Sequence, residues 1–87
     1  MASYRLVFKK PVAKDLRQIP NADVVRILRR IEALGDDPRP SGSEKLSGQE
    51  KYRVRQGVYR IVYEIKDEVL IVTVVKVGHR KNIYKQG

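Results

Sequence analysis

The feature that most constrains the fold is a set of three apolar, β-branched segments separated by breaks too short to hold a helix. The segments span residues 52–56, 58–66 and 69–77, and the breaks are Gln56-Gly57 and Lys66-Asp67-Glu68. Segments of this length and composition, joined by such short links, predict an antiparallel meander. The last segment is apolar at nearly every position, so we expect it to be the most buried strand.

Alternation along the meander predicts which side chains share a face. In the first segment, Arg53 and Arg55 point away from the row that holds Tyr52 and Val54. In the second segment, Arg60 lies opposite the row formed by Tyr59, Ile61, Tyr63 and Ile65. We therefore expect the three arginines to lie together on the face of the sheet that is left bare, which would suit a polyanion.

The residues before the meander predict one strand and two helices. Residues 4–9 alternate as a strand does. Pro11 suits the first turn of a helix, which Pro20 should end. The apolar stripe of this first helix is Val12, Leu16 and Ile19.

The second helix has the stronger pattern. Asn21 is a good N-cap, and Gly35 is placed to end the helix at C′. Its apolar stripe is Val24, Ile27, Leu28, Ile31 and Leu34. A long loop over residues 36–43 follows, after which Leu46 is expected to reach the core.

The order strand, helix, helix and three strands predicts a single α+β domain over residues 1–87. One twisted, mainly antiparallel sheet should carry an αα-hairpin on one face. There are no cysteines, which excludes disulfides and thiolate metal sites. No apolar run approaches the ~20 residues of a membrane span, and the N-terminus lacks the apolar block of a secretory signal. We expect a cytoplasmic protein.

The net charge of the chain indicates which classes of molecule it binds. Nineteen Lys and Arg against ten Asp and Glu give a formal net charge of +9. Such an excess is typical of nucleic-acid-binding proteins, although an acidic protein partner would satisfy the same field. The basic face of the second helix, by contrast, is expected to be solvated.

Four segments in order resemble the RelE group of the RelE/ParE superfamily of bacterial toxins. They are Lys45-Leu46-Ser47-Gly48, Tyr52-Arg53-Val54-Arg55, Tyr59-Arg60-Ile61-Val62-Tyr63 and Gly78-His79-Arg80 followed by Tyr84. The predicted order of elements is similar as well. Three departures stand out: arginines replace lysines at positions 53 and 55, His79 takes a position often held by another basic residue, and Tyr84 is two residues closer to Arg80.

The resemblance implies an endoribonuclease, or mRNA interferase, that cuts messenger RNA in the ribosomal A site and so inhibits translation and growth. By position, it implies that Arg53 and Arg55 bind RNA, and we expect Lys51 and Lys81 to contribute to that binding. The resemblance places Arg55, Arg60, Arg80 and Tyr84 in the catalytic set, to which we add His79 as a candidate. It also implies a cognate acidic antitoxin similar to RelB, with operator DNA bound only through that antitoxin. Because three residues follow Tyr84, we expect no extra C-terminal helix over the site.

The residues fit one kind of RNA chemistry. With one histidine, a two-histidine mechanism within one molecule is excluded, and no His and carboxylate cluster has metal-ligand spacing. We expect no cofactor or metal and a 2′-OH attack supported by arginine clamps. Arg60 and Arg80 would stabilise the phosphorane, and Tyr84 would stack on a base. Arginine is a poor general base, so His79 is either the acid or base or a structural residue at the strand end.

Two other functions stay open at the level of sequence. A ParE-like toxin shares the fold and poisons DNA gyrase without RNA chemistry, and it need not keep the arginine set. A non-catalytic RNA-binding module would be harmless when overproduced without an antitoxin.

Overall fold

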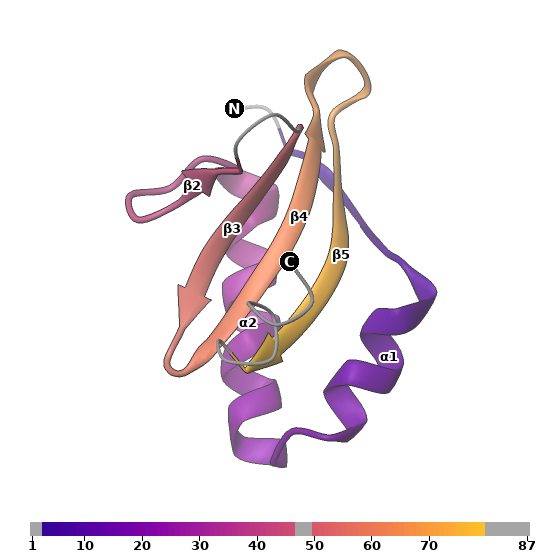
Figure 1. Cartoon of the computed structure of the whole chain (residues 1–87). Helices are drawn as coiled ribbons and strands as arrows, with labels where there is room; N and C mark the ends of the chain where they lie inside the picture. The colour runs from indigo at the N-terminus through magenta and orange to yellow at the C-terminus, as the bar shows by residue number, and fades with distance from the viewer. Residues whose placement is uncertain (1–2, 47–49, 80–87) are drawn as a thin grey trace.

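The chain folds as a five-stranded mixed sheet with two helices. Residues 3–46 and 50–79 are described in a computed structural model (Figure 1). The elements are β1 (Arg5–Phe8), α1 (Lys10–Arg17), α2 (Asn21–Asp36), β2 (Glu44–Lys45), β3 (Lys51–Gln56), β4 (Tyr59–Lys66), a 3₁₀ turn η1 (Asp67–Val69) and β5 (Ile71–His79). The predicted α+β class and the meander of β3, β4 and β5 are confirmed. The two-residue strand β2 was not predicted.

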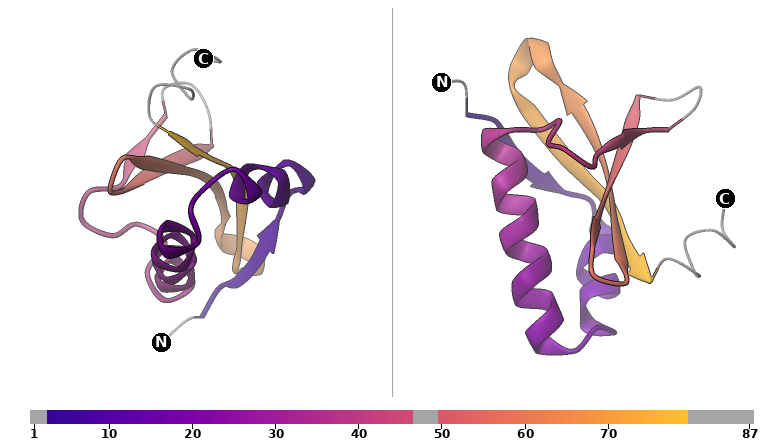
Figure 2. Two further views of the ribbon diagram at one scale, coloured as in Figure 1. Left: turned by 90° about the horizontal axis from the view of Figure 1, so that it is seen from below. Right: turned by 90° about the vertical axis from the view of Figure 1, so that its left-hand side faces the viewer.

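The order of strands in the sheet is β1-β5-β4-β3-β2. β1 pairs in parallel with β5, and the other neighbours pair antiparallel. The parallel pair is possible because the two helices carry the chain from the end of β1 back across one face of the sheet. Both helices lie against that face, and the other face is turned away from them (Figure 2).

The core lies between this face and the helices. It contains Tyr63, Ile61 and Val54 from the meander and Ile27, Ile31 and Leu34 from α2. The prediction that the last strand would be the most buried is wrong. β4 holds more buried residues than β5, because β4 is the central strand and has a partner on each side.

α1 confirms its predicted stripe and fixes the end of β5. Val12 and Ile19 are buried, although Ile19 lies past the last residue of the helix. Asp15 accepts a hydrogen bond of 3.2 Å from the backbone N–H of Val77. Its other oxygen lies 3.5 Å from the Nζ of Lys76. These two contacts hold α1 beside the last part of β5.

The ends of α2 differ from the predicted ones. Pro20 is the N-cap, and Asn21 is the first helical residue, with no side-chain cap hydrogen bond at this end. Gly35 lies inside the helix. A Cβ at Gly35 would come within 3.2 Å of the carbonyl oxygen of Tyr4, and the N–H of Tyr4 donates to the Gly35 carbonyl at 2.8 Å. The glycine therefore permits the close approach of the chain before β1. Leu28, predicted in the stripe, is 41% exposed.

The hydroxyl of Tyr63 is a buried polar anchor. It donates a 2.7 Å hydrogen bond to the carbonyl oxygen of Pro38 in the loop after α2. Burial is the main cause that raises the pKa of Tyr63 to about 12. We expect Tyr63→Phe to lower the free energy of unfolding by about 1–3 kcal/mol, because it leaves a buried carbonyl without its donor.

Urea titration of the wild type and Tyr63→Phe measures this effect. Tyr59→Phe is the matched control, since its hydroxyl makes a longer bond of 3.4 Å to Asp23 in a partly buried position. We expect a smaller loss for the control. Equal losses would contradict a special role for the bond to Pro38.

Candidate nucleic-acid interface

Four basic side chains share the face of the sheet turned away from the helices. The register of β3 and β4 places Arg55 opposite Arg60, Arg53 opposite Val62 and Lys51 opposite Glu64. Directly paired residues lie on the same face. The predicted grouping of the arginines is therefore confirmed. We call these four side chains the basic row: Lys51, Arg53, Arg55 and Arg60.

The basic row is not uniformly exposed. Arg55 is exposed, and Lys51 and Arg53 are half-buried. Arg60, by contrast, is only 2% exposed, and its neighbour Val62 is buried as well. The expectation of a bare face is therefore wrong along β4, where residues of β3 and β5 flank Arg60 and Val62. A guanidinium in such a low-dielectric place attracts a phosphate more strongly than an exposed one does.

Arg53 is held by an acidic side chain of β2. Glu44 pairs with Arg53 in the register, and the Nη2 of Arg53 lies 3.1 Å from the Oε2 of Glu44. Sequence reasoning missed Glu44 because a strand of two residues has no periodicity to recognise. The contact orients a guanidinium that could meet a phosphate.

His79 belongs to the other face of the sheet. It pairs with Tyr59, which contacts the helices, and the two rings meet edge to face with centroids 6.0 Å apart. On that side, a groove is lined by Lys14 of α1 and by Gln18, which follows α1, together with Tyr59 and His79. The structure thus separates His79 from the basic row.

The remaining predicted site residues are Arg80, Lys81 and Tyr84, and they lie outside the described residues. The expectation about a C-terminal helix concerns the same part of the chain. Within residues 3–46 and 50–79, no group of three or more His, Asp or Glu side chains is placed to hold a metal ion. In the same part of the chain, no helix is long and apolar enough to cross a membrane.

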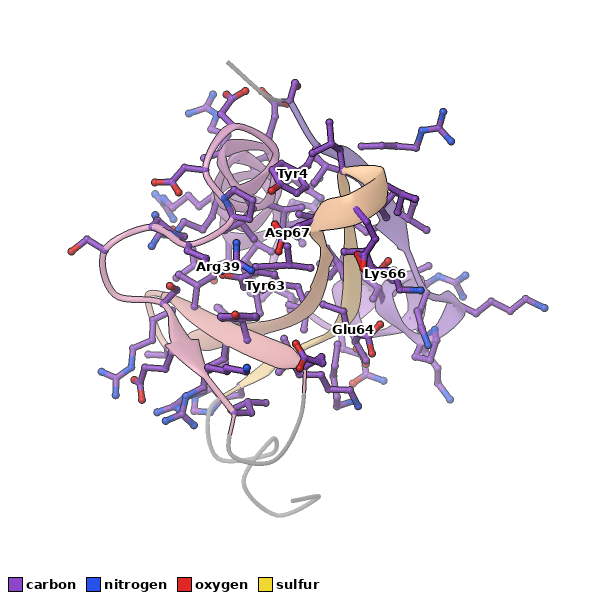
Figure 3. All side chains as sticks on the ribbon, turned by 90° about the horizontal axis from the view of Figure 1, so that it is seen from above. Tyr4, Arg39, Tyr63, Glu64, Lys66 and Asp67 are labelled. Carbon is purple, nitrogen blue, oxygen red and sulfur yellow. The ribbon has the colours of Figure 1, made fainter. Side chains whose placement is uncertain are left out.

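A second polar cluster lies at the opposite end of the sheet from His79. We call it the Arg39 clasp, and it consists of Tyr4, Arg39, Tyr52 and Asp67 (Figure 3). Arg39 donates from Nη1 and Nη2 to the two oxygens of Asp67 at 3.2 and 2.9 Å. Its Nε donates to the hydroxyl of Tyr52 at 3.2 Å, and its guanidinium lies 5.3 Å from the centre of that ring.

The clasp joins segments that are distant in sequence. Tyr4 precedes β1, Arg39 lies in the loop after α2, Tyr52 is in β3, and Asp67 begins η1. The hydroxyl of Tyr4 donates to Asp67 at 2.6 Å. Sequence analysis missed this cluster because Asp67 meets the loop only in the folded protein. A lone arginine between two prolines gives no periodic signal.

The clasp predicts a pH dependence of stability. Hydrogen bonds from Arg39 first, and from Tyr4 second, lower the pKa of Asp67 to about 2. The fold thus favours the carboxylate, so its stabilising effect is complete above the unfolded-state pKa of ~4 and is lost as the pH falls through about 2. We expect the difference in unfolding free energy between the wild type and Asp67→Asn to be constant above about pH 5 and to shrink below about pH 4.

Urea titrations at a series of pH values measure that difference. A gap that stays constant down to about pH 2 would show that Asp67 carries no such linkage.

Comparison with known proteins gives a consistent result. Residues 6–84 match the family model described as the ParE toxin of the type II toxin–antitoxin system parDE. The toxin RelG of Mycobacterium tuberculosis is 32% identical over 91 residues, which cover 95% of this chain and 98% of RelG. The RelE–RelB complex of Pyrococcus horikoshii contains a chain with a TM-score of 0.80 and 30% identity, over 90% of this chain and 96% of that one. The isolated Escherichia coli toxin RelE has a TM-score of 0.77 and 26% identity, over 97% and 94% of the two chains.

Proposed function

This chain belongs to the RelE/ParE family of toxins of type II toxin–antitoxin systems, and from this premise we propose that it is an endoribonuclease. It cleaves messenger RNA in the ribosomal A site and so inhibits translation and growth. The observation that carries the proposal is the basic row, in which the paired strands β3 and β4 place Arg55 directly opposite Arg60.

The proposed reaction is attack of a ribose 2′-OH on the adjacent phosphorus. The bond from phosphorus to the 5′ oxygen of the next nucleotide breaks, leaving a 2′,3′-cyclic phosphate and a 5′-hydroxyl. The 2′-OH loses its proton, and the departing 5′ oxygen gains one. Arg60 and Arg80 stabilise the charge on the phosphorane, because guanidinium groups can bind two phosphate oxygens at once.

The other residues bind and orient the RNA. Arg53 and Arg55, with Lys51 and Lys81, hold the backbone, and Arg55 also contacts the cleaved phosphate. Tyr84 stacks on a base that is splayed out for in-line attack, an interaction that is worth ~1–3 kcal/mol in other proteins. His79 pairs with Tyr59, so it lies on the opposite face of the sheet from the basic row. It serves as acid or base only if the RNA reaches around the end of β5.

The partner we propose is a small acidic antitoxin similar to RelB. The net charge of +9 favours an acidic chain, and the P. horikoshii relative was crystallised with RelB. Operator DNA would be bound by the pair through the antitoxin. The ribosome supplies the messenger.

A second candidate is a gyrase-poisoning toxin, since the matching family model is described as a ParE toxin. It requires no RNA chemistry, so it makes no use of Arg55 and Arg60 as a pair. The two candidates differ in the damage that they cause in a cell, and this difference provides the test.

We expect induction of the wild type to stop growth and to produce messengers with new 5′ ends inside codons. Arg80→Ala should lose both effects, because removing one charge-stabilising donor typically lowers a rate by about 100-fold or more. The measurements are growth curves and transcriptome-wide mapping of 5′ ends. A DNA damage response without cut messengers would favour gyrase as the target. Harmless overproduction of the wild type would favour a non-catalytic RNA-binding module.

A further inference from the structure

We propose that the Arg39 clasp is a positioning device for Arg53, acting through the loop after α2 and through β2. The inference rests on the proposed function, in which Arg53 binds the RNA backbone. Arg39 and Asp67 do not themselves lie in the basic row. They fix the place of the segment that carries Glu44, and Glu44 in turn orients Arg53.

The loop between α2 and β2 is tied to the sheet by side chains. Its backbone makes local bonds, such as the 3.0 Å bond from the Ser43 N–H to the Pro40 carbonyl. Side chains attach it to β4 and to η1: the hydroxyl of Tyr63 donates to the buried Pro38 carbonyl, and Arg39 donates two bonds to Asp67. A bidentate pair of this kind fixes orientation as well as distance.

The same arginine also reaches β3. It contacts the ring and hydroxyl of Tyr52, and Tyr52 pairs with Lys45 of β2 in the register. The ring of Tyr52 stacks in turn on Tyr63, with centroids 5.9 Å apart. Arg39 is therefore anchored on both β3 and the turn η1.

β2 needs these anchors because it is very short. It has two residues, Glu44 and Lys45, and a ladder this small has few bonds of its own. Its pairing with β3 ends at the N–H of Leu46, which donates to the Lys51 carbonyl at 2.8 Å. If the loop moved, the carboxylate of Glu44 would leave its place 3.1 Å from Arg53.

Glu44 matters because the guanidinium is planar and binds a phosphate best from a defined direction. The carboxylate of Glu44, 3.1 Å from the Nη2 of Arg53, holds one end of the guanidinium and so limits the directions in which the group can face. The clasp would thus influence RNA binding from a distance, through the chain Asp67, Arg39, loop, Glu44 and Arg53.

The test uses a variant for which general electrostatics and the clasp predict different changes in RNA affinity. Asp67→Asn removes one negative charge, so the net charge rises from +9 to +10. General electrostatics then predicts equal or tighter RNA binding. The clasp predicts binding that is weaker by about 3- to 10-fold, because Arg39 loses its charged partner. The probe is short single-stranded 2′-O-methyl RNA of mixed sequence, which cannot be cleaved by 2′-OH attack, and the readout is the dissociation constant of the full-length protein.

Asp23→Asn is the matched control. It causes the same change of charge and also removes an arginine's partner, Arg26 at 3.3 Å, but on α2. We expect its RNA binding to be unchanged or tighter. In an Arg53→Gln background, Asp67→Asn should have no further effect on binding, which a general loss of stability would not explain. Weakening of the same size in both backgrounds, or no weakening by Asp67→Asn at all, would overturn the inference.

Hydrogen exchange tests the structural half without RNA. We expect the Leu46 amide to exchange at least ~10-fold faster in Asp67→Asn than in Asp23→Asn, because local opening of β2 becomes easier. Unchanged exchange would overturn the inference even if the wild type binds RNA. A wild type that binds no RNA would instead refute the proposed role of Arg53, while the exchange rate would still decide whether the clasp holds β2.

Discussion

Replacing Arg60 with alanine is expected to lower the rate of messenger cleavage by about 100-fold or more, the largest effect on activity that we expect within the described part of the chain. The reason is position. Arg60 is 2% exposed on the central strand and lies directly opposite Arg55. A charge held rigidly in a low-dielectric site stabilises a developing phosphorane without reorganising at the moment of reaction. Cleavage of a defined messenger on purified ribosomes measures the rate.

Three further variants separate this effect from its alternatives. Arg60→Lys keeps the charge and loses the planar fork, so we expect it to recover only part of the activity. Arg55→Ala should raise KM more than it lowers kcat, because Arg55 is exposed and contributes to binding. His79→Asn should lower the rate by less than ~10-fold. Removing a general acid or base would lower the rate by at least about 100-fold.

The controls decide how the result is interpreted. Because Arg60 is buried, its replacement could unfold the protein, so each variant needs an unfolding curve, and only folded variants are compared. An Arg60→Ala protein that is folded and fully active would remove the arginine from the mechanism. A His79→Asn protein that loses activity to the same degree, with a changed pH profile, would restore His79 as the acid or base.

Much of this fold could be predicted because its signals are local and periodic. The runs that became β3, β4 and β5 are marked by β-branched residues and by short breaks, and the same alternation placed Arg55 and Arg60 in one row. The stripe of α2 predicted Ile27, Ile31 and Leu34 as core residues. Each of these signals can be recognised within a few residues of the chain.

The features that sequence analysis missed depend on what lies beside a residue in space. Arg60 is 2% exposed, and the alternation along β4 does not show which side chains will pack around it. Gly35 was predicted to end a helix, yet it serves contact with the chain at Tyr4. Arg39 in the loop after α2 contacts Asp67 in η1, and the two are separated by 28 positions in sequence. Periodicity carries no information on such contacts.

Ile27→Ala is expected to destabilise the fold by about 2–5 kcal/mol, the largest loss of stability that we expect from a single change. Ile27 is 0% exposed in the middle of α2, where it packs between the helix and the sheet, so its truncation leaves a cavity. Small domains are typically stable by only about 5–15 kcal/mol. The variant should therefore lose its toxicity in a growing cell, although Ile27 is a core residue of α2 and not a member of the basic row.

Val25→Ala on the same helix is the matched control. Val25 is 48% exposed, and alanine is the better helix former, so we expect little change or a slight gain in stability. Urea titration of both variants, with the slope of the transition held equal, measures the two free energies of unfolding. Equal losses would mean that the apolar stripe of α2 does not carry the core. A large loss confined to Ile27→Ala would show that the packing of α2 on the sheet stabilises the fold in which β3 and β4 bring Arg55 and Arg60 together.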